Sequence, residues 1–224
     1  MGEFVKLTAS DGHELDAYVA KPEGEPIAGL VVVQEIFGVN THIRAVTDGW
    51  AKDGFLAVAP ALFDRVERGV DLGYEGADRE KAMSFMPKLD AEMMAKDTAA
   101  ALAYAREHSG KKTGIVGYCL GGSIAWQMAS RGLADAAVGY YGGFISRFAD
   151  AELQCPVILH FGAKDLHITE EYRAKIAAAH PEVPIYVYDS AGHGFNCDMR
   201  SSYDAAAAKL ARERSLEFVK EKLA

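Results

Sequence analysis

The sequence predicts an α/β fold in which helices cover both faces of a mostly parallel β-sheet. Short apolar runs recur along the chain, and segments of helical composition lie between them. The expected strands span residues 14–21, 30–33, 55–59, 115–118, 136–140, 157–161 and 185–188. The expected helices span residues 41–53, 90–108, 120–130, 169–180 and 203–223. Because ligands gather beyond the carboxyl ends of parallel strands, functional residues are expected just after the strands.

The expected strands are of two kinds. Residues 14–21 partly alternate between apolar and polar side chains, as on a strand with one solvent-facing side. Residues 30–33 are apolar throughout and mostly β-branched, which is typical of a strand buried on both faces, and the five later runs are of this buried type. In the expected helices, apolar residues recur every three or four positions.

Length and composition favour a single domain over residues 1–224. The chain is 50% hydrophobic, enough for one substantial core, and the glycine-bounded stretch 69–76 is expected to be a surface excursion within that domain. No apolar stretch approaches the roughly 20 residues that span a bilayer. The first ten residues lack the continuous apolar segment of a secretory signal, so a cytoplasmic protein with no membrane partner is expected.

Charge and cysteine usage exclude several classes of protein. The formal net charge of −8 disfavours binding to nucleic acid. Cys119, Cys155 and Cys197 form neither an even-numbered disulfide framework nor a paired metal motif, so no metal or disulfide scaffold is expected. The oligomeric state stays open, with a monomer possible.

The strongest chemical signal is the segment Gly117-Tyr118-Cys119-Leu120-Gly121-Gly122. It follows a strand-like run and precedes a helical one, as in a nucleophile elbow with cysteine at its centre. The tight turn forces the central residue into a strained backbone conformation, and the glycines relieve crowding. The alternative is a buried structural cysteine beside a glycine-rich turn.

A nucleophile needs a base, and the base needs a group that orients it. Asp165 follows the run 157–161, and His193 follows the run 185–188 between two glycines. The order nucleophile, acid, histidine is that of α/β-hydrolases. His167 is the main rival to His193, whereas His160 lies inside a strand and is expected to be a core residue.

An acyl-transfer site also needs donors for the oxyanion. The Leu120 amide is the first candidate, and the Ile36 amide, in the loop after residues 30–33, is the second. The same loop carries Glu35, which is either a partner of the site or an ordinary surface carboxylate.

Together with the elbow, Gln34-Glu35-Ile36-Phe37-Gly38-Val39-Asn40 resembles the signature segments of the dienelactone hydrolases, and the resemblance covers nearly the whole chain. It implies an α/β-hydrolase fold without a large cap, no cofactor, and hydrolysis of small cyclic enol esters bearing a carboxylate. It also implies that Glu35 contacts the resting Cys119 thiol and later helps to remove its proton.

In that family two arginines hold the substrate carboxylate. Arg79 matches the first, but Cys197 stands at the expected place of the second, four residues after His193. Arg200 is expected to be a solvated surface charge. Phe37 and Tyr141 are assigned to the substrate pocket, in which Met83 stands where the family usually has tyrosine.

The sequence therefore predicts a carboxylic ester hydrolase, most simply of a dienelactone, that acts through Cys119, Asp165 and His193 with Glu35. One alternative is a carboxylesterase or thioesterase of broader range on the same triad. A second, of another class, is a non-catalytic ligand-binding protein that retains the fold.

Overall fold

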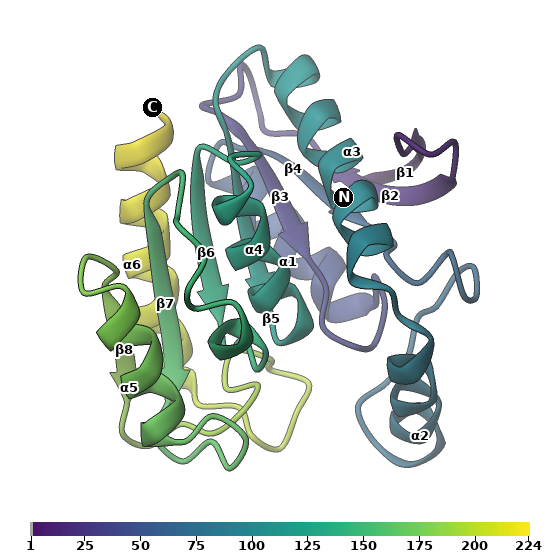
Figure 1. The fold of residues 1–224 in the computed structure, drawn as a ribbon. Coiled ribbons are helices and arrows are strands. Elements are labelled where there is room, and N and C mark those ends of the chain that lie inside the picture. The colour runs from purple at the N-terminus through teal and green to yellow at the C-terminus, as the bar shows by residue number, and fades with distance from the viewer. Residues whose placement is uncertain (1) are drawn as a thin grey trace.

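A computed structural model describes residues 2–224 and shows one eight-stranded sheet between two layers of helices (Figure 1). The strands are β1 (Glu3–Thr8), β2 (Glu14–Ala20), β3 (Gly29–Val33), β4 (Leu56–Pro60), β5 (Thr113–Tyr118), β6 (Ala136–Tyr140), β7 (Val157–Gly162) and β8 (Ile185–Tyr188). Their order in the sheet is β1-β2-β4-β3-β5-β6-β7-β8. The β1–β2 and β2–β4 pairs are antiparallel, and the strands from β4 to β8 pair in parallel.

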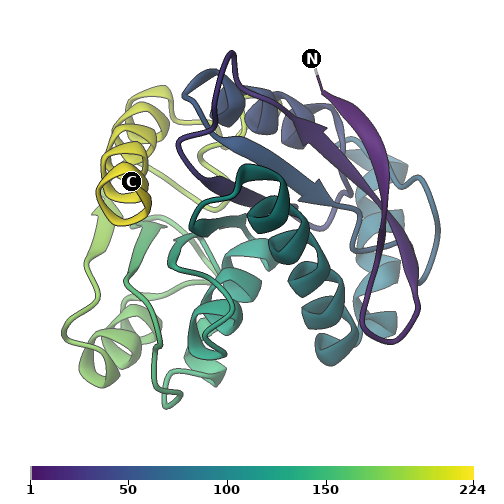
Figure 2. The same ribbon diagram turned by 90° about the horizontal axis from the view of Figure 1, so that it is seen from above.

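The helices are α1 (Thr41–Lys52), α2 (Gly76–Phe85), α3 (Ala91–Ser109), α4 (Leu120–Ser130), α5 (Glu170–Ala179) and α6 (Ala205–Leu223), with short 3₁₀ turns η1 (Met86–Lys88) and η2 (Ile145–Arg147). Helices α3, α4 and α5 cover one face of the sheet, and α1 and α6 cover the other (Figure 2). Because both faces are covered, β3 to β7 are buried along their whole length. The predicted fold class is confirmed.

Several helix ends follow directly from local chemistry. Asn40, Asp90, Thr169 and Asp204 each accept a hydrogen bond from an amide in the first turn of the helix that follows, which satisfies donors that a helix start leaves free. Gly110 ends α3 in the left-handed conformation, which glycine adopts without a steric penalty.

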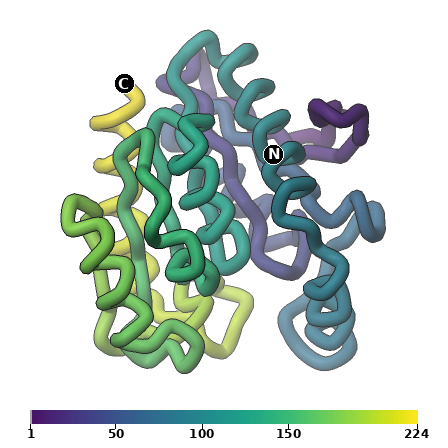
Figure 3. The backbone as a smooth tube through the Cα atoms, in the orientation of Figure 1, coloured from purple at the N-terminus to yellow at the C-terminus, as the bar shows by residue number. Residues whose placement is uncertain are grey.

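The structure adds β1 and α2 to the elements expected from sequence. Strand β1 lies at the sheet edge with most of its side chains exposed, and α2 buries only Ala82 and Phe85. Neither element therefore needs a long apolar pattern. Figure 3 shows the excursion between β4 and α3, which carries α2 beyond the carboxyl end of the sheet. Within residues 2–224 no separate cap domain covers this end, and no helix is long and apolar enough to cross a membrane.

A fully buried polar network joins β6, β7, β8 and α6. His160 Nδ1 lies 2.9 Å from the Tyr188 hydroxyl, and His160 Nε2 lies 3.0 Å from Ser215 Oγ. The Tyr140 hydroxyl is 2.7 Å from the same Ser215 Oγ. Burial, with a smaller contribution from Arg214, lowers the pKa of His160 to about 3. The imidazole is therefore neutral in the folded protein, in the core as predicted.

This network predicts a loss of stability in acid. Between the ordinary pKa of 6.5 and the folded value of about 3, the unfolded chain binds a proton at His160 that the native protein excludes. The free energy of unfolding should therefore fall as pH falls below 6.5, by up to about 1.4 kcal/mol per pH unit from this residue. Urea unfolding of wild type and His160→Gln at several pH values measures it. The prediction is wrong if the difference in unfolding free energy between wild type and His160→Gln does not shrink as the pH is lowered.

Candidate active site

The strand-to-helix turn at Cys119 has the geometry of a nucleophile elbow. Cys119 joins β5 to α4 with φ 54° and ψ −112°, a strained conformation for a residue with a side chain. A Cβ on Gly117 would lie 1.9 Å from the Gly121 carbonyl oxygen, and a Cβ on Gly121 would lie 2.3 Å from the Val33 oxygen. Glycine at both positions therefore lets α4 pack against β3 and β5 closely enough to hold the turn.

The three side chains predicted to act together meet at the ends of β5, β7 and β8. His193 Nε2 lies 3.2 Å from Cys119 Sγ, and His193 Nδ1 lies 2.7 Å from Asp165 Oδ2. Asp165 Oδ1 accepts hydrogen bonds from the amides of His167 and Ile168, so the carboxylate is fixed in place. His167 contributes its amide to Asp165 and packs edge-on to His193, 5.9 Å between ring centroids.

The electrostatics favour a proton on the histidine. Burial by itself lowers the pKa of His193, but Coulombic attraction to Cys119 and hydrogen bonds with Asp165 and Cys119 outweigh it and raise the pKa to about 10. Burial likewise raises the pKa of Asp165, yet the hydrogen bonds from His193 and from the two amides lower it overall. The group can therefore hold an imidazolium between two negative charges.

Two backbone amides are free to bind an oxyanion. Within residues 2–224 the amides of Leu120 and Ile36 donate to no backbone or side-chain acceptor. The segments that carry them are tied together, because the Gly121 amide donates to the Gln34 carbonyl at 3.1 Å. The start of α4 adds the positive end of its dipole to this position.

Glu35 is buried and faces an arginine. Its carboxylate is 1% exposed, and Oε1 accepts a hydrogen bond from Arg200 Nη1 at 3.2 Å. The expectation of a solvated Arg200 is therefore wrong: its side chain is 23% exposed, and its guanidinium lies over the rings of Phe37 and Tyr74. The spacing from His193 pointed to position 197, which is a cysteine. The loop after His193 folds back over the site and instead brings Arg200, seven residues after His193, to Glu35.

Within residues 2–224 no hydrogen bond joins Glu35 to Cys119. The hydrogen-bonding partner of Cys119 Sγ is His193, and Glu35 Oε2 is buried without any partner in the described chain. The physical reason is the competition for each group, since Arg200 holds the carboxylate and imidazole holds the sulfur.

A cleft of about 360 Å³ opens beside the triad. Its lining combines the start of α2 with the loop after β8: Tyr74, Glu75, Gly76, Arg79, His193, Arg200, Ser201 and Ser202. Arg79 is exposed at this cleft, whereas Arg200, the other arginine in the lining, is half-buried. Tyr74, which the sequence did not single out, lies here because the 69–76 excursion folds inward.

The remaining pocket residues are buried beneath the site. Phe37 is 4% exposed and packs on Tyr74, 4.5 Å between ring centroids. Tyr141 is fully buried, packs against His193, and has a hydroxyl without a partner in the described chain. Their assignment to substrate binding stays a prediction.

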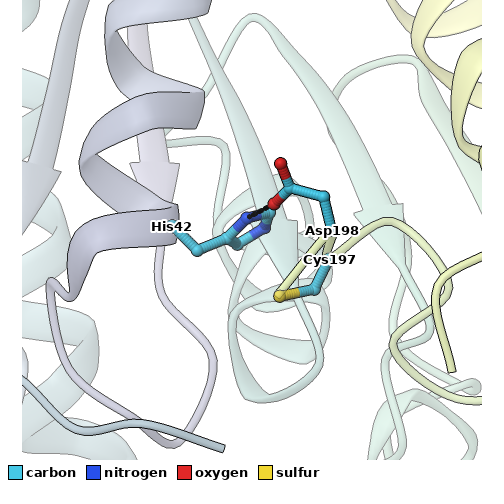
Figure 4. Close-up of side chains that lie close together, drawn as sticks. All are labelled: His42, Cys197 and Asp198. Carbon is cyan, nitrogen blue, oxygen red and sulfur yellow. Dashed lines mark hydrogen bonds and ion pairs between the residues drawn. The ribbon is translucent and has the colours of Figure 1, made fainter. Parts of the chain in front are cut away.

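His42, Cys197 and Asp198 bring three potential metal-binding atoms within 4.8 Å of one another (Figure 4). Two of them are already engaged, because His42 Nδ1 lies 3.1 Å from Asp198 Oδ1. Burial raises the pKa of the Cys197 thiol to about 11, so at neutral pH it is protonated and a poor ligand. We interpret the group as a tether between the start of α1 and the loop that carries Arg200.

Comparisons with known proteins agree with this geometry. Residues 15–223 match the model of the dienelactone hydrolase family. The carboxymethylenebutenolidase of Pseudomonas putida is 36% identical, with 97% of this chain and 95% of that protein aligned. Carboxymethylenebutenolidase 1 of Cupriavidus pinatubonensis is 31% identical over 98% of this chain and 97% of its own.

A solved structure supports the same relationship. The crystal structure of a putative dienelactone hydrolase from Klebsiella pneumoniae superposes with a TM-score of 0.81 at 30% identity, and covers 96% of this chain and 98% of that one. The match in sequence thus extends over the sheet, the elbow and the segments after β7 and β8. The chain belongs to the dienelactone hydrolase family and is a dienelactone hydrolase-like hydrolase of the α/β-hydrolase fold.

Proposed function

We propose that this protein hydrolyses a small anionic lactone or ester, of which a dienelactone is the simplest example, with Cys119 as nucleophile. The observation that carries the proposal is the continuous row Cys119, His193, Asp165 at the elbow, with hydrogen-bonding distances of 3.2 and 2.7 Å. The names of the carboxymethylenebutenolidase relatives support the substrate class.

The geometry suggests the following steps. His193 takes the Cys119 proton, and the thiolate attacks the acyl carbon while the Leu120 and Ile36 amides hold the oxyanion. The tetrahedral intermediate collapses, the acyl carbon to oxygen bond breaks, and His193 gives its proton to the leaving oxygen. Water then loses a proton to His193 and attacks the thioester, which returns the Cys119 thiol and releases the acid.

Glu35 and Arg200 suit recognition of an anionic substrate. A substrate carboxylate in the cleft would compete with Glu35 for the Arg200 guanidinium, and the released Glu35 would lie buried with no cationic partner. Glu35 as a participant in the chemistry remains the sequence-based hypothesis. In the present arrangement His193 is the better placed base for Cys119.

The test is hydrolysis of a dienelactone beside a neutral aryl ester of similar size. Arg200→Gln should lower kcat/KM for the dienelactone by about 10- to 100-fold, because a hydrogen bond to a charged group contributes about 1.5–3 kcal/mol. Arg79→Ala should cost less, since its side chain is exposed. The neutral ester should change by about threefold or less in both variants.

Two controls keep this test sharp. The double variant Glu35→Gln/Arg200→Gln separates loss of the anion site from the cost of an unpaired buried Glu35. Arg131→Gln removes an arginine paired with Glu92 at the far end of α4 and should leave both substrates unaffected. Strong neutral-ester activity, together with dienelactone activity indifferent to Arg200 and Arg79, would instead favour a carboxylesterase or thioesterase of broad range.

A further inference from the structure

A second concavity, separate from the charged cleft, starts at the elbow and follows α4. It has a volume of about 200 Å³, and most of its lining is apolar: Met86, Leu89, Met94, Ile124, Phe144 and Phe148. These side chains come from the η1–α3 segment, from α4 and from the loop after β6. We call it the α4 groove.

One end of the groove is lined by the residue next to Cys119. Leu120, whose amide is a proposed oxyanion donor, lines the groove, whereas His193 lines the charged cleft, and the two concavities share no lining residue. Cys119 is bonded to Leu120 through the backbone and to His193 through its sulfur. Cys119 therefore lies between one residue that lines the apolar groove and one that lines the charged cleft.

Three polar side chains line the groove, Ser123, Gln127 and Arg147, and Ser123 has a hydrogen-bond partner within the protein. Ser123 Oγ accepts a hydrogen bond from the Phe144 amide at 3.0 Å. The Arg147 guanidinium stacks over the Phe144 ring, 4.8 Å from its centroid. Leu120, Ile124 and Gln127 follow one face of α4 over seven residues, a rise of about 10 Å. The groove is thus long, narrow and apolar at its elbow end, with Gln127 at its far end.

The chemistry decides which half of an ester enters the groove. His193 has to deliver a proton to the leaving oxygen, so the leaving group lies on the His193 side, at the charged cleft. The acyl substituent extends from the same carbon in another direction. Leu120 follows Cys119 in the chain and lines the groove, which makes the groove the nearby apolar space for that substituent.

On the basis of the proposed hydrolysis, we infer that the α4 groove binds the hydrocarbon acyl chain of an ester or thioester. The substrates of this protein therefore include medium-chain acyl esters, from butanoyl to octanoyl, with polar or anionic leaving groups. A compact lactone would leave the groove empty.

The experiment is a series of p-nitrophenyl esters from acetate to octanoate, with the leaving group held constant. Each buried methylene contributes about 0.8 kcal/mol, so kcat/KM should rise about two- to fourfold per added methylene until the groove is filled. Leu89→Trp narrows the groove from a half-buried wall position and should abolish this gain, so that octanoate is hydrolysed no faster than acetate. Phe148→Ala, at an exposed wall position, should reduce the gain for hexanoate several-fold.

The matched control is Leu210→Trp, an exposed site on α6 across the sheet, which should keep the wild-type dependence on chain length. The inference is overturned if Cys119-dependent acetate hydrolysis occurs without any gain from longer chains. A gain that survives both groove variants overturns it too, since the chain would then bind elsewhere. Absence of hydrolysis for every ester and for the dienelactone would instead overturn the proposed function itself.

Discussion

Cys119→Ala is expected to lower kcat/KM by about 10³-fold or more for every ester or lactone that the protein hydrolyses. Alanine keeps the elbow and both oxyanion donors but removes the only side chain that the geometry aims at the acyl carbon. Residual catalysis would come from binding and the oxyanion hole alone. Steady-state hydrolysis of the dienelactone and of a neutral aryl ester measures the loss.

A covalent readout separates this effect from misfolding. Mass spectrometry of the wild type, quenched during turnover of a slow ester, should show the added mass of one acyl group, and Cys119→Ala should show none. Cys155→Ser is the control, because Cys155 is half-buried beside Val157 and Phe218, in a different concavity from the triad. Full activity without Cys119 would exclude it as the nucleophile.

Asp165→Asn is expected to reduce kcat by about 10⁴-fold, the cost of the same substitution in a Ser-His-Asp triad. The asparagine oxygen can still accept the hydrogen bonds from the amides of His167 and Ile168, so its NH₂ group faces His193 Nδ1. That donor forces the imidazole proton onto Nε2, the nitrogen beside Cys119. A neutral ring in this tautomer cannot accept the thiol proton.

The pH profile gives an independent readout of Asp165. Burial lowers the pKa of His193, but its interactions with Cys119 and Asp165 outweigh burial and raise that pKa to about 10. The alkaline limb of kcat/KM, which reports the free enzyme, should therefore lie near that pH. In Asp165→Asn the carboxylate no longer raises the pKa of His193, so the alkaline limb should move to lower pH. Asp150→Asn, at an exposed position, is the control. An unshifted alkaline limb would show that Asp165 does not act on His193.

The sequence predicted the elements with a clear apolar pattern and missed two elements that lack one. The run 185–188 was expected to be buried, but it forms the edge strand β8, in which Val187 is 41% exposed. Strands β3 to β7 are covered on both faces, so their apolar runs mark them clearly. Strand β1 is a mostly exposed edge strand, and α2 turns only Ala82 and Phe85 inward, so neither carries a strong periodic signal.

The same contrast separates the triad from the charged cleft. Cys119 and Asp165 follow the buried strands β5 and β7, and His193 follows the edge strand β8. Because these strands are parallel, their carboxyl ends bring the three residues to one end of the sheet. Arg200 reaches Glu35 only because a turn-rich loop folds back, and loop conformation leaves little trace in composition. Arg200 follows His193 by seven residues in the same loop, and this closeness in sequence could have identified it as a candidate site residue.

The His42–Asp198 tether bears on which substitutions could change the position of Arg200 during evolution. The triad depends on sheet register, whereas Arg200 depends on a short loop fastened to α1 at one point. Substitutions that loosen or re-anchor that loop would move the arginine without disturbing the strand ends that carry the chemistry. Given the anion-binding role proposed for Arg200, substitutions in this loop should change substrate preference, in nature or in laboratory selection, while the proposed triad keeps its geometry.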